Sequence, residues 1–74
     1  MNPDEKLVYM ANQIASFFAP QGAERAMPGI ADHLMRYWDP RMRRRIIEIA
    51  RNEQAPIESV VRKALLLLRD SNER

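Results

Sequence analysis

The residues best suited to catalysis lie in one short segment, DHLMRYWDPRMRRR, residues 32–45. His33, the only histidine, directly follows Asp32, and an Asp–His pair could act as a general base. Adjacent residues on a helix point in different directions, so this pair does not form if the segment is helical. Packing or hydrogen bonding is the commoner role for such a histidine. Because the chain also lacks a Ser–His arrangement, a carboxylate pair and a glycine-rich phosphate loop, we expect it not to be an enzyme.

The composition removes most other kinds of site. The 74 residues contain no cysteine and one histidine, which excludes disulfides, thiolate metal sites, a cysteine nucleophile and an all-histidine metal site within one chain. We therefore expect no catalytic residue, no cofactor and no metal in this chain. A domain this short has a marginal core and usually relies on disulfides, a metal or a partner. Of these supports, the composition leaves a partner open.

Arginines make the middle of the chain basic. Residues 36–51 contain six arginines against Asp39 and Glu48, although the net charge of the whole chain is only +2. On a helix these arginines point in several directions instead of forming one stripe. Those at the start of a helix oppose its dipole, so we expect a compensating negative group outside the helix. The cluster has three interpretations, which are a solvated face, a protein-docking surface and, less favoured, a phosphate-binding surface for nucleic acid.

Proline and glycine divide the chain into segments that we predict to be helices. Asn2 and Asp39 are suitable N-caps, and each is followed by a proline at the first helical position. No segment alternates apolar and polar residues like a strand. The predicted fold is therefore all-α, a small bundle of about four short helices in a single domain, residues 1–74, with a frayed tail at 71–74. The predicted helices cover roughly 3–19, 28–38, 40–53 and 56–70, with a loop at 20–27.

Apolar residues at helical spacing predict which helix faces form the core. In the first predicted helix these residues are Leu7, Met10, Ala11, Ile14, Phe17 and Phe18, and in the last they are Ile57, Val60, Val61, Ala64, Leu65 and Leu68. Leu66 lies about 180° from Ile57 around the last helix, on its polar side. We therefore expect that one four-helix core does not bury the whole of the segment ALLLL, residues 64–68.

The same segment is the longest apolar run, and it is far shorter than the roughly 20 residues needed to span a bilayer. The N-terminal MNPDEK carries acidic residues where a signal peptide carries positive charge. A chain without cysteine also suits a reducing compartment. We therefore expect a cytoplasmic protein with no membrane partner.

Trp38 has two interpretations. A lone tryptophan most often fills a small core. With Arg41 and Met42 beside it, however, Trp38 also has the composition of a protein interface, where Trp, Tyr, Met and Arg are enriched.

Two stretches carry a family resemblance, KLVYMANQIASFF at 6–18 and IADHLMRYWDPRMRR at 30–44. Together they resemble the small delta subunits of molybdenum-containing, NAD-linked formate dehydrogenases. The family pattern is a K-L-x-x-M-A-N-Q-I-x-x-F-F helix, a loop of variable length, A-x-H-L/I, an aromatic–Trp pair and D/T-P-R-M. The matching residues are Lys6, Leu7, Met10, Ala11, Asn12, Gln13, Ile14, Phe17, Phe18, Ala31, His33, Leu34, Tyr37, Trp38, Asp39, Pro40, Arg41 and Met42.

The resemblance implies a subunit of a complex whose large subunit binds a molybdenum pterin cofactor and iron–sulfur clusters and oxidises formate. Other subunits would pass the electrons through flavin to NAD. The delta chain would carry no cofactor and would support the assembly, stability or cofactor maturation of the enzyme. We expect it to dock onto the large subunit. The candidate contact residues are Trp38, Arg41, Arg43, Arg44, Asn12, Gln13 and His33.

Two alternatives remain open from the sequence. In the first, the chain is a small helical nucleic-acid-binding module that uses Arg36 and the arginines of residues 41–51. Its affinity for duplex nucleic acid would fall steeply with salt. In the second, which ranks lower, it is a self-associating helical protein with no other partner.

Overall fold

The computed structural model of the protein describes the backbone of residues 1–72 and the side chains of residues 1–69. Four α-helices and one short 3-10 helix make up this part of the chain, and it contains no strand, which confirms the predicted all-α class. The elements are α1 (Pro3–Phe18), η1 (Ala19–Gln21), α2 (Ala23–Tyr37), α3 (Pro40–Ala50) and α4 (Ser59–Asn72).

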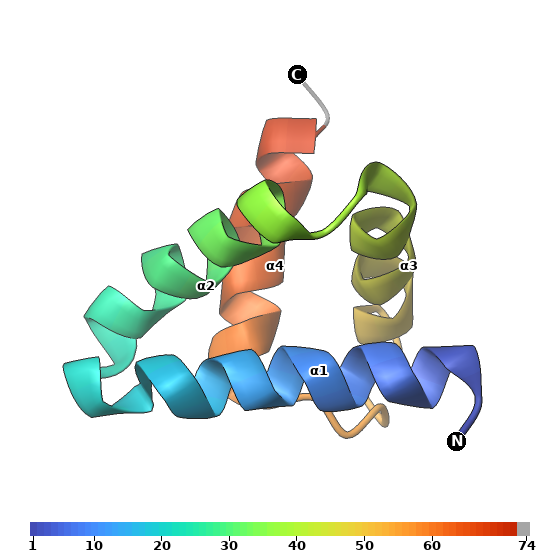
Figure 1. Cartoon of the computed structure of the whole chain (residues 1–74), viewed down its shortest axis with the longest axis horizontal. Helices are drawn as coiled ribbons and strands as arrows, with labels where there is room; N and C mark the ends of the chain where they lie inside the picture. The colour runs from blue at the N-terminus through green and yellow to red at the C-terminus, as the bar shows by residue number, and fades with distance from the viewer. Residues whose placement is uncertain (73–74) are drawn as a thin grey trace.

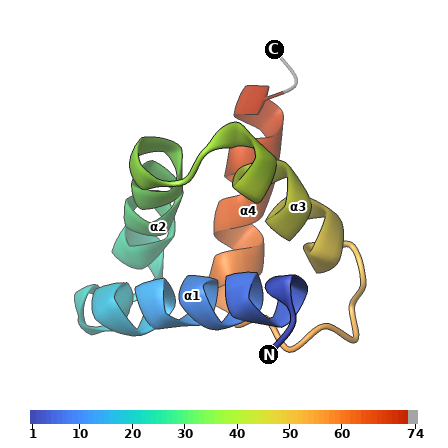
Figure 2. The same cartoon turned by 45° about the vertical axis from the view of Figure 1, so that its right-hand side comes forward.

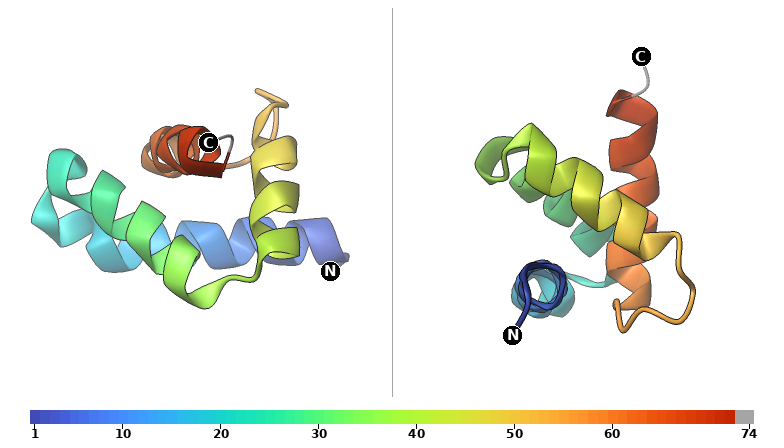
Figure 3. Two further views of the ribbon diagram at one scale, coloured as in Figure 1. Left: turned by 90° about the horizontal axis from the view of Figure 1, so that it is seen from above. Right: turned by 90° about the vertical axis from the view of Figure 1, so that its right-hand side faces the viewer.

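Helix α1 lies across one end of the other three helices (Figure 1). Helices α2 and α3 meet at a corner above α1, and α4 rises behind them (Figures 1 and 2). Seen from above, α2 and α3 form a V whose open side faces α4 (Figure 3, left). The most extensive packing between two helices is that of α2 against α4.

Helix α1 begins where the sequence predicts. The side chain of Asn2 accepts a hydrogen bond from the backbone N–H of Glu5 at 2.8 Å, and Pro3 takes the first helical position. Asp4 and Glu5 place negative charge in the first turn, where the helix dipole favours it.

Helix α2 begins earlier than predicted, because residues 23–27 continue the helix instead of forming a loop. Gly22, with φ +89°, turns the chain, and its carbonyl accepts from Ala26 N–H at 2.8 Å. Pro28 therefore lies inside the helix rather than at its start. In the second turn a proline removes only one helical hydrogen bond, and the added turn buries Ala26 in the core. A proline-based prediction of the helix start was wrong for this reason.

The predicted restart at Asp39-Pro40 is confirmed. Trp38 leaves helical geometry with φ −98° and ψ 137°, and Asp39, with φ −72° and ψ 165°, has the extended geometry expected for the residue before a proline. The carboxylate of Asp39 then accepts from Met42 N–H at 2.9 Å and caps α3.

The connection between α3 and α4 is longer than predicted. Helix α3 ends at Ala50 rather than at residue 53, and α4 begins at Ser59 rather than at residue 56. Residues 51–58 form turns and an extended segment that carries the buried Ile57 into the core. At its far end, α4 continues through Asn72, past its predicted end at residue 70. Residues 73–74, the end of the predicted frayed tail, lie outside the described residues.

The core lies where the four helices meet. Its buried side chains are Val8, Ala11, Ala15, Ala26, Ile30, Leu34, Trp38, Ile46, Ile57, Val61, Ala64, Leu65 and Leu68. Helix α1 presents Val8 and two alanines to the core, because small residues at a helix contact allow a short interaxial distance. The large residues of the predicted face are displaced to its side, and Phe17, predicted to be buried, is 75% exposed. Leu66 is 56% exposed, which confirms the expectation for the last helix.

None of the helices within residues 1–72 combines the length and the apolar character that crossing a membrane requires.

Candidate docking surface

The Asp32–His33 pair does not form in the structure. Asp32 instead forms an ion pair with Arg36, one helical turn away, at 2.9 Å. The ring of His33 lies between two aromatic rings, 4.7 Å from Tyr37 and 6.4 Å from Phe18. His33 is therefore a packing residue on the surface of α2, as the sequence favours. Within the described part of the chain, no group of three or more His, Cys, Asp or Glu residues could hold a metal ion.

Trp38 and Arg43 build the corner between α2 and α3. Trp38 is only 5% exposed, so it fills the core, and this is the first of its two predicted roles. The guanidinium of Arg43 donates to the carbonyls of Leu34, at 3.5 Å, and Met35, at 3.3 Å, and also to that of Trp38. Helix C-termini leave carbonyls without an intrahelical partner. Arg43 therefore caps α2 from α3.

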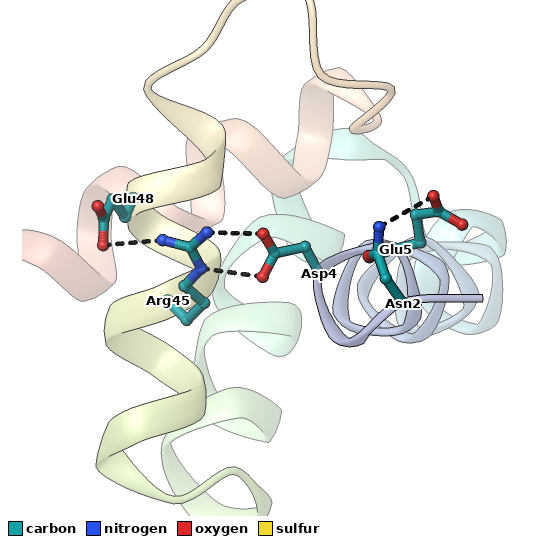
Figure 4. A network of polar contacts seen from close by, with 5 residues as sticks. All are labelled: Asn2, Asp4, Glu5, Arg45 and Glu48. Carbon is teal, nitrogen blue, oxygen red and sulfur yellow. Dashed lines mark hydrogen bonds and ion pairs between the residues drawn. The ribbon is translucent and has the colours of Figure 1, made fainter.

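Arg45 provides the link between α3 and α1 (Figure 4). Its guanidinium donates to both carboxylate oxygens of Asp4, at 2.9 and 2.6 Å, and also contacts Glu48 at 3.3 Å. Hydrogen bonding to Arg45, together with its charge, lowers the pKa of Asp4 below its ordinary value of 3.8. The same contact raises the pKa of Arg45. The negative group that the basic start of α3 requires is thus supplied by α1 of the same chain.

The remaining arginines of this region do not form one surface. Arg41 borders a hollow between α1 and α3, and Arg51 borders another between α3 and α4. Arg44 is exposed on α3. Among the described residues, none of these three side chains has an ion pair or hydrogen bond.

Asn12 and Gln13 are neighbours with different surroundings. The amide of Asn12 donates to the carbonyl of Pro56 at 2.9 Å and accepts from Glu58 N–H at 3.0 Å, which ties the 51–58 connection to α1. Gln13 donates to the hydroxyl of Tyr9 at 2.8 Å and remains exposed.

Arg62 is a structural residue that the sequence analysis missed. Its guanidinium donates to the carbonyls of Ala50 and Ala55, at 2.5 and 2.6 Å, and to that of Asn52 at 3.1 Å. It thus closes the end of α3 and the following turns. Nothing in the local sequence distinguishes it from the exposed Lys63 beside it.

Phe17 and Tyr37 are the most exposed aromatic residues in the described part of the chain, at 75% and 73%. Each directly precedes an aromatic residue that packs inward, Phe18 and Trp38. Phe17 and Phe18 are about 100° apart on α1, so only one of them faces the core, and Trp38 turns inward after leaving the helical geometry of Tyr37. The pairs Phe17-Phe18 and Tyr37-Trp38 were therefore the signal that could have identified this surface from the sequence.

Two hollows lie beside these residues along α1. One, of about 290 Å³, is lined by Met10, Gln13, Ile14, Phe17, Phe18, His33 and Trp38. The other, of about 420 Å³, is lined by Pro3, Lys6, Leu7, Met10, Arg41, Met42 and Arg45. Met10 lines both, so the two hollows adjoin at this residue, and we call the surface that they make together the α1 groove. Of the predicted contact residues, the groove contains Gln13, His33, Trp38 and Arg41.

A family model matches residues 6–65 of the chain, and it describes the NADH-dependent formate dehydrogenase delta subunit FdsD. Neither the curated proteins nor the solved structures yielded a match.

Proposed function

Because the chain belongs to the family of NADH-dependent formate dehydrogenase delta subunits, we propose that it is a non-catalytic accessory subunit that docks onto the large subunit of such an enzyme. It would act in the cytoplasm and support the assembly, stability or cofactor maturation of the complex. The molybdenum pterin, iron–sulfur clusters and flavin would be held by the other subunits.

The observation that carries this proposal is the exposed aromatic surface of Phe17 and Tyr37. Phe17 and Tyr37 leave about three quarters of their area open, on a domain whose own core is small. Exposed apolar patches of this kind mark protein interaction sites more often than enzyme active sites built from polar groups. Family membership names the complex. Within the fold, Phe17 contacts Phe18 and Tyr37 contacts His33, and most of the area of Phe17 and Tyr37 is left open to a partner.

Three polar residues have roles within the fold, which supports a non-catalytic role for the chain. Arg43 and Arg62 are engaged with backbone carbonyls, and Asn12 holds the 51–58 connection. These side chains maintain the shape of the chain. Of the seven predicted contacts, Trp38, Arg43 and Asn12 would then act by shaping the surface, while Gln13, His33, Arg41 and Arg44 would be free to touch the partner.

Co-purification tests the proposal. The chain is tagged and co-expressed with the large formate dehydrogenase subunit and the rest of the complex. We expect the large subunit to be retained with the tagged chain, and formate oxidation to fall when the chain is omitted. If the tagged chain is recovered alone while the remaining subunits assemble with full activity, the proposal is wrong.

The nucleic-acid alternative predicts a different outcome from the same protein. Duplex DNA binding by phosphate contacts would weaken steeply between low and moderate salt. The ion pairs Arg36–Asp32 and Arg45–Asp4, together with the carbonyl contacts of Arg43, engage three of the six arginines and leave three for such contacts. We therefore expect a weak titration with little salt dependence. Self-association of the isolated chain is measured separately by sedimentation.

A further inference from the structure

We propose that the α1 groove binds an amphipathic helix of the large subunit, with acidic residues at the end near Lys6 and Arg41 and apolar residues at the end near Phe17. This inference rests on the proposed function and assigns its contact surface. It places the interface on α1 and the facing walls of α2 and α3, rather than on the arginine-rich surface of α3 as a whole.

The floor of the groove is a stripe along α1. Its lining residues recur every three or four positions, from Pro3 through Leu7, Met10 and Ile14 to Phe17. This is the spacing with which one helix presents a continuous apolar face to another. At 1.5 Å per residue the stripe is about 21 Å long, which accommodates about four turns of a partner helix.

The opposite wall comes from the corner between α2 and α3. His33 and Trp38 border the groove on one side of Met10, and Arg41 and Met42 border it on the other. The corner lies above α1 (Figure 1), and its residues border both hollows. The two segments that carry the family resemblance are therefore the floor and the wall of one groove.

The charges at the two ends of the groove differ. At the N-terminal end of α1, Lys6 and Arg41 have no hydrogen bond or ion pair from their side chains to any described residue, whereas Arg45 is neutralised by Asp4 and Glu48. At the other end, His33 is the only ionisable side chain in the lining. Two unpaired cations beside an apolar floor complement carboxylates on the occupant, because opposite potentials face each other across specific interfaces. This asymmetry places the acidic end of the occupant beside Lys6 and Arg41 and its apolar end beside Phe17.

Charge reversal at the basic end is the first test. The double variant Lys6→Glu with Arg41→Glu is compared with the matched control Lys63→Glu with Arg51→Glu, in which the same residue types change outside the groove. Near the starts of α1 and α3, glutamate suits the helix dipole, so the groove variant is expected to fold. Circular dichroism and thermal unfolding verify this. In co-purification with the large subunit, we expect the groove variant to lose about tenfold or more of the retained partner, and the control to remain within about twofold.

The apolar end is tested in the same way. Phe17→Ser is compared with Leu66→Ser, since both residues are more than half exposed and neither belongs to the buried core. Removing an aromatic anchor from an interface typically costs at least about tenfold in affinity. We expect such a loss for Phe17→Ser and retention within about twofold for Leu66→Ser.

Photo-crosslinking identifies the occupant. A benzoylphenylalanine at position 41 should crosslink to an acidic segment of the large subunit, and one at position 17 to an apolar segment within the same helix. Crosslinks to a second copy of this chain, or to two unrelated segments, would overturn the assignment. If the unmodified chain retains the large subunit and the groove variants behave like their controls, the groove inference fails while the proposed function stands. If the unmodified chain retains no large subunit, the proposed function itself fails.

Discussion

The α2–α3 corner and the α1 groove use the same residue types in opposite ways. At the corner, Trp38 is buried and Arg43 is bound to carbonyls. In and beside the groove, Phe17 and Tyr37 are open to solvent and Arg41 has no described partner. Residue type alone therefore does not distinguish the part of this chain that maintains the fold from the part that is left free for a partner.

The contrast also holds within pairs of neighbours. Trp38 is buried while Tyr37 is exposed, and Arg43 caps a helix while Arg44 points to solvent. Each pair places one side chain in the fold and the other outside it. Arg43 and Arg44 lie about 100° apart on α3, and Trp38 has left the helical geometry that Tyr37 still has. Each exposed neighbour is therefore a control for the structural one.

The largest expected effect is at Trp38. Trp38→Ala removes a large buried side chain, which typically costs about 3–5 kcal/mol of stability. A 74-residue domain has about 4–11 kcal/mol in total, so this variant should be largely unfolded or close to it. Tyr37→Ala should change the free energy of unfolding by no more than about 0.5 kcal/mol. Urea unfolding followed by far-ultraviolet circular dichroism measures both free energies. Equal losses of stability in the two variants would contradict the distinction between the buried Trp38 and the exposed Tyr37.

A smaller effect is expected at Arg43. Arg43→Met keeps the apolar stem but removes the guanidinium that donates to the carbonyls of Met35 and Trp38, whereas the carbonyl of Leu34 keeps the N–H of Trp38. Losing such a partner costs about 1–3 kcal/mol. Arg44→Met removes the same charge from an exposed position and should cost about 0.5 kcal/mol or less. The same urea titration decides between them. A loss at Arg44 as large as that at Arg43 would show that charge, and not the carbonyl contacts, carries the effect.

Much of the fold follows from local signals in the sequence. Asn2-Pro3 and Asp39-Pro40 place the starts of α1 and α3, because a capping side chain and a proline act within one turn. Pro28 misled the prediction, since whether a proline starts a helix or lies within it depends on the residues before it. In this chain Gly22 sets the start of α2 before Pro28, because it forms a turn that requires a positive φ.

The surface was harder to predict than the helices. The sequence analysis named Trp38, Arg43 and Asn12 as candidate partner contacts, and the structure shows their side chains engaged inside the fold. Their contacts join residues far apart in the chain, as between Asn12 and Glu58, and no local pattern specifies them. Phe17 was assigned to the core because it belongs to the apolar face of α1. This face is wider than the part of α1 that contacts the other helices at Ala11 and Ala15, so Phe17 lies outside the contact.

Asn12 and Gln13 give the next comparison. Asn12→Ala removes the two hydrogen bonds that hold the 51–58 connection, and we expect a loss of about 1–2 kcal/mol. Gln13→Ala should have little effect on stability, since its amide contacts only the exposed hydroxyl of Tyr9. Hydrogen exchange adds a local readout, because in the Asn12 variant the amide of Glu58 should lose protection. Unchanged protection of that amide would contradict the role given to Asn12.

The smallest effect is expected at the Asp4–Arg45 pair, which joins α1 to α3 beside the basic end of the groove (Figure 4). Because Arg45 lowers the pKa of folded Asp4 below 3.8, the carboxylate stabilises the fold fully at pH values above 3.8. This contribution is lost as the pH falls through the lower folded pKa. A double-mutant cycle of Asp4→Asn and Arg45→Gln should therefore give a favourable coupling at neutral pH that disappears in acid. Both side chains are nearly half exposed, so salt should also reduce the coupling. A coupling that survived acid would show that it does not depend on the charge of Asp4, which would contradict the ion-pair assignment.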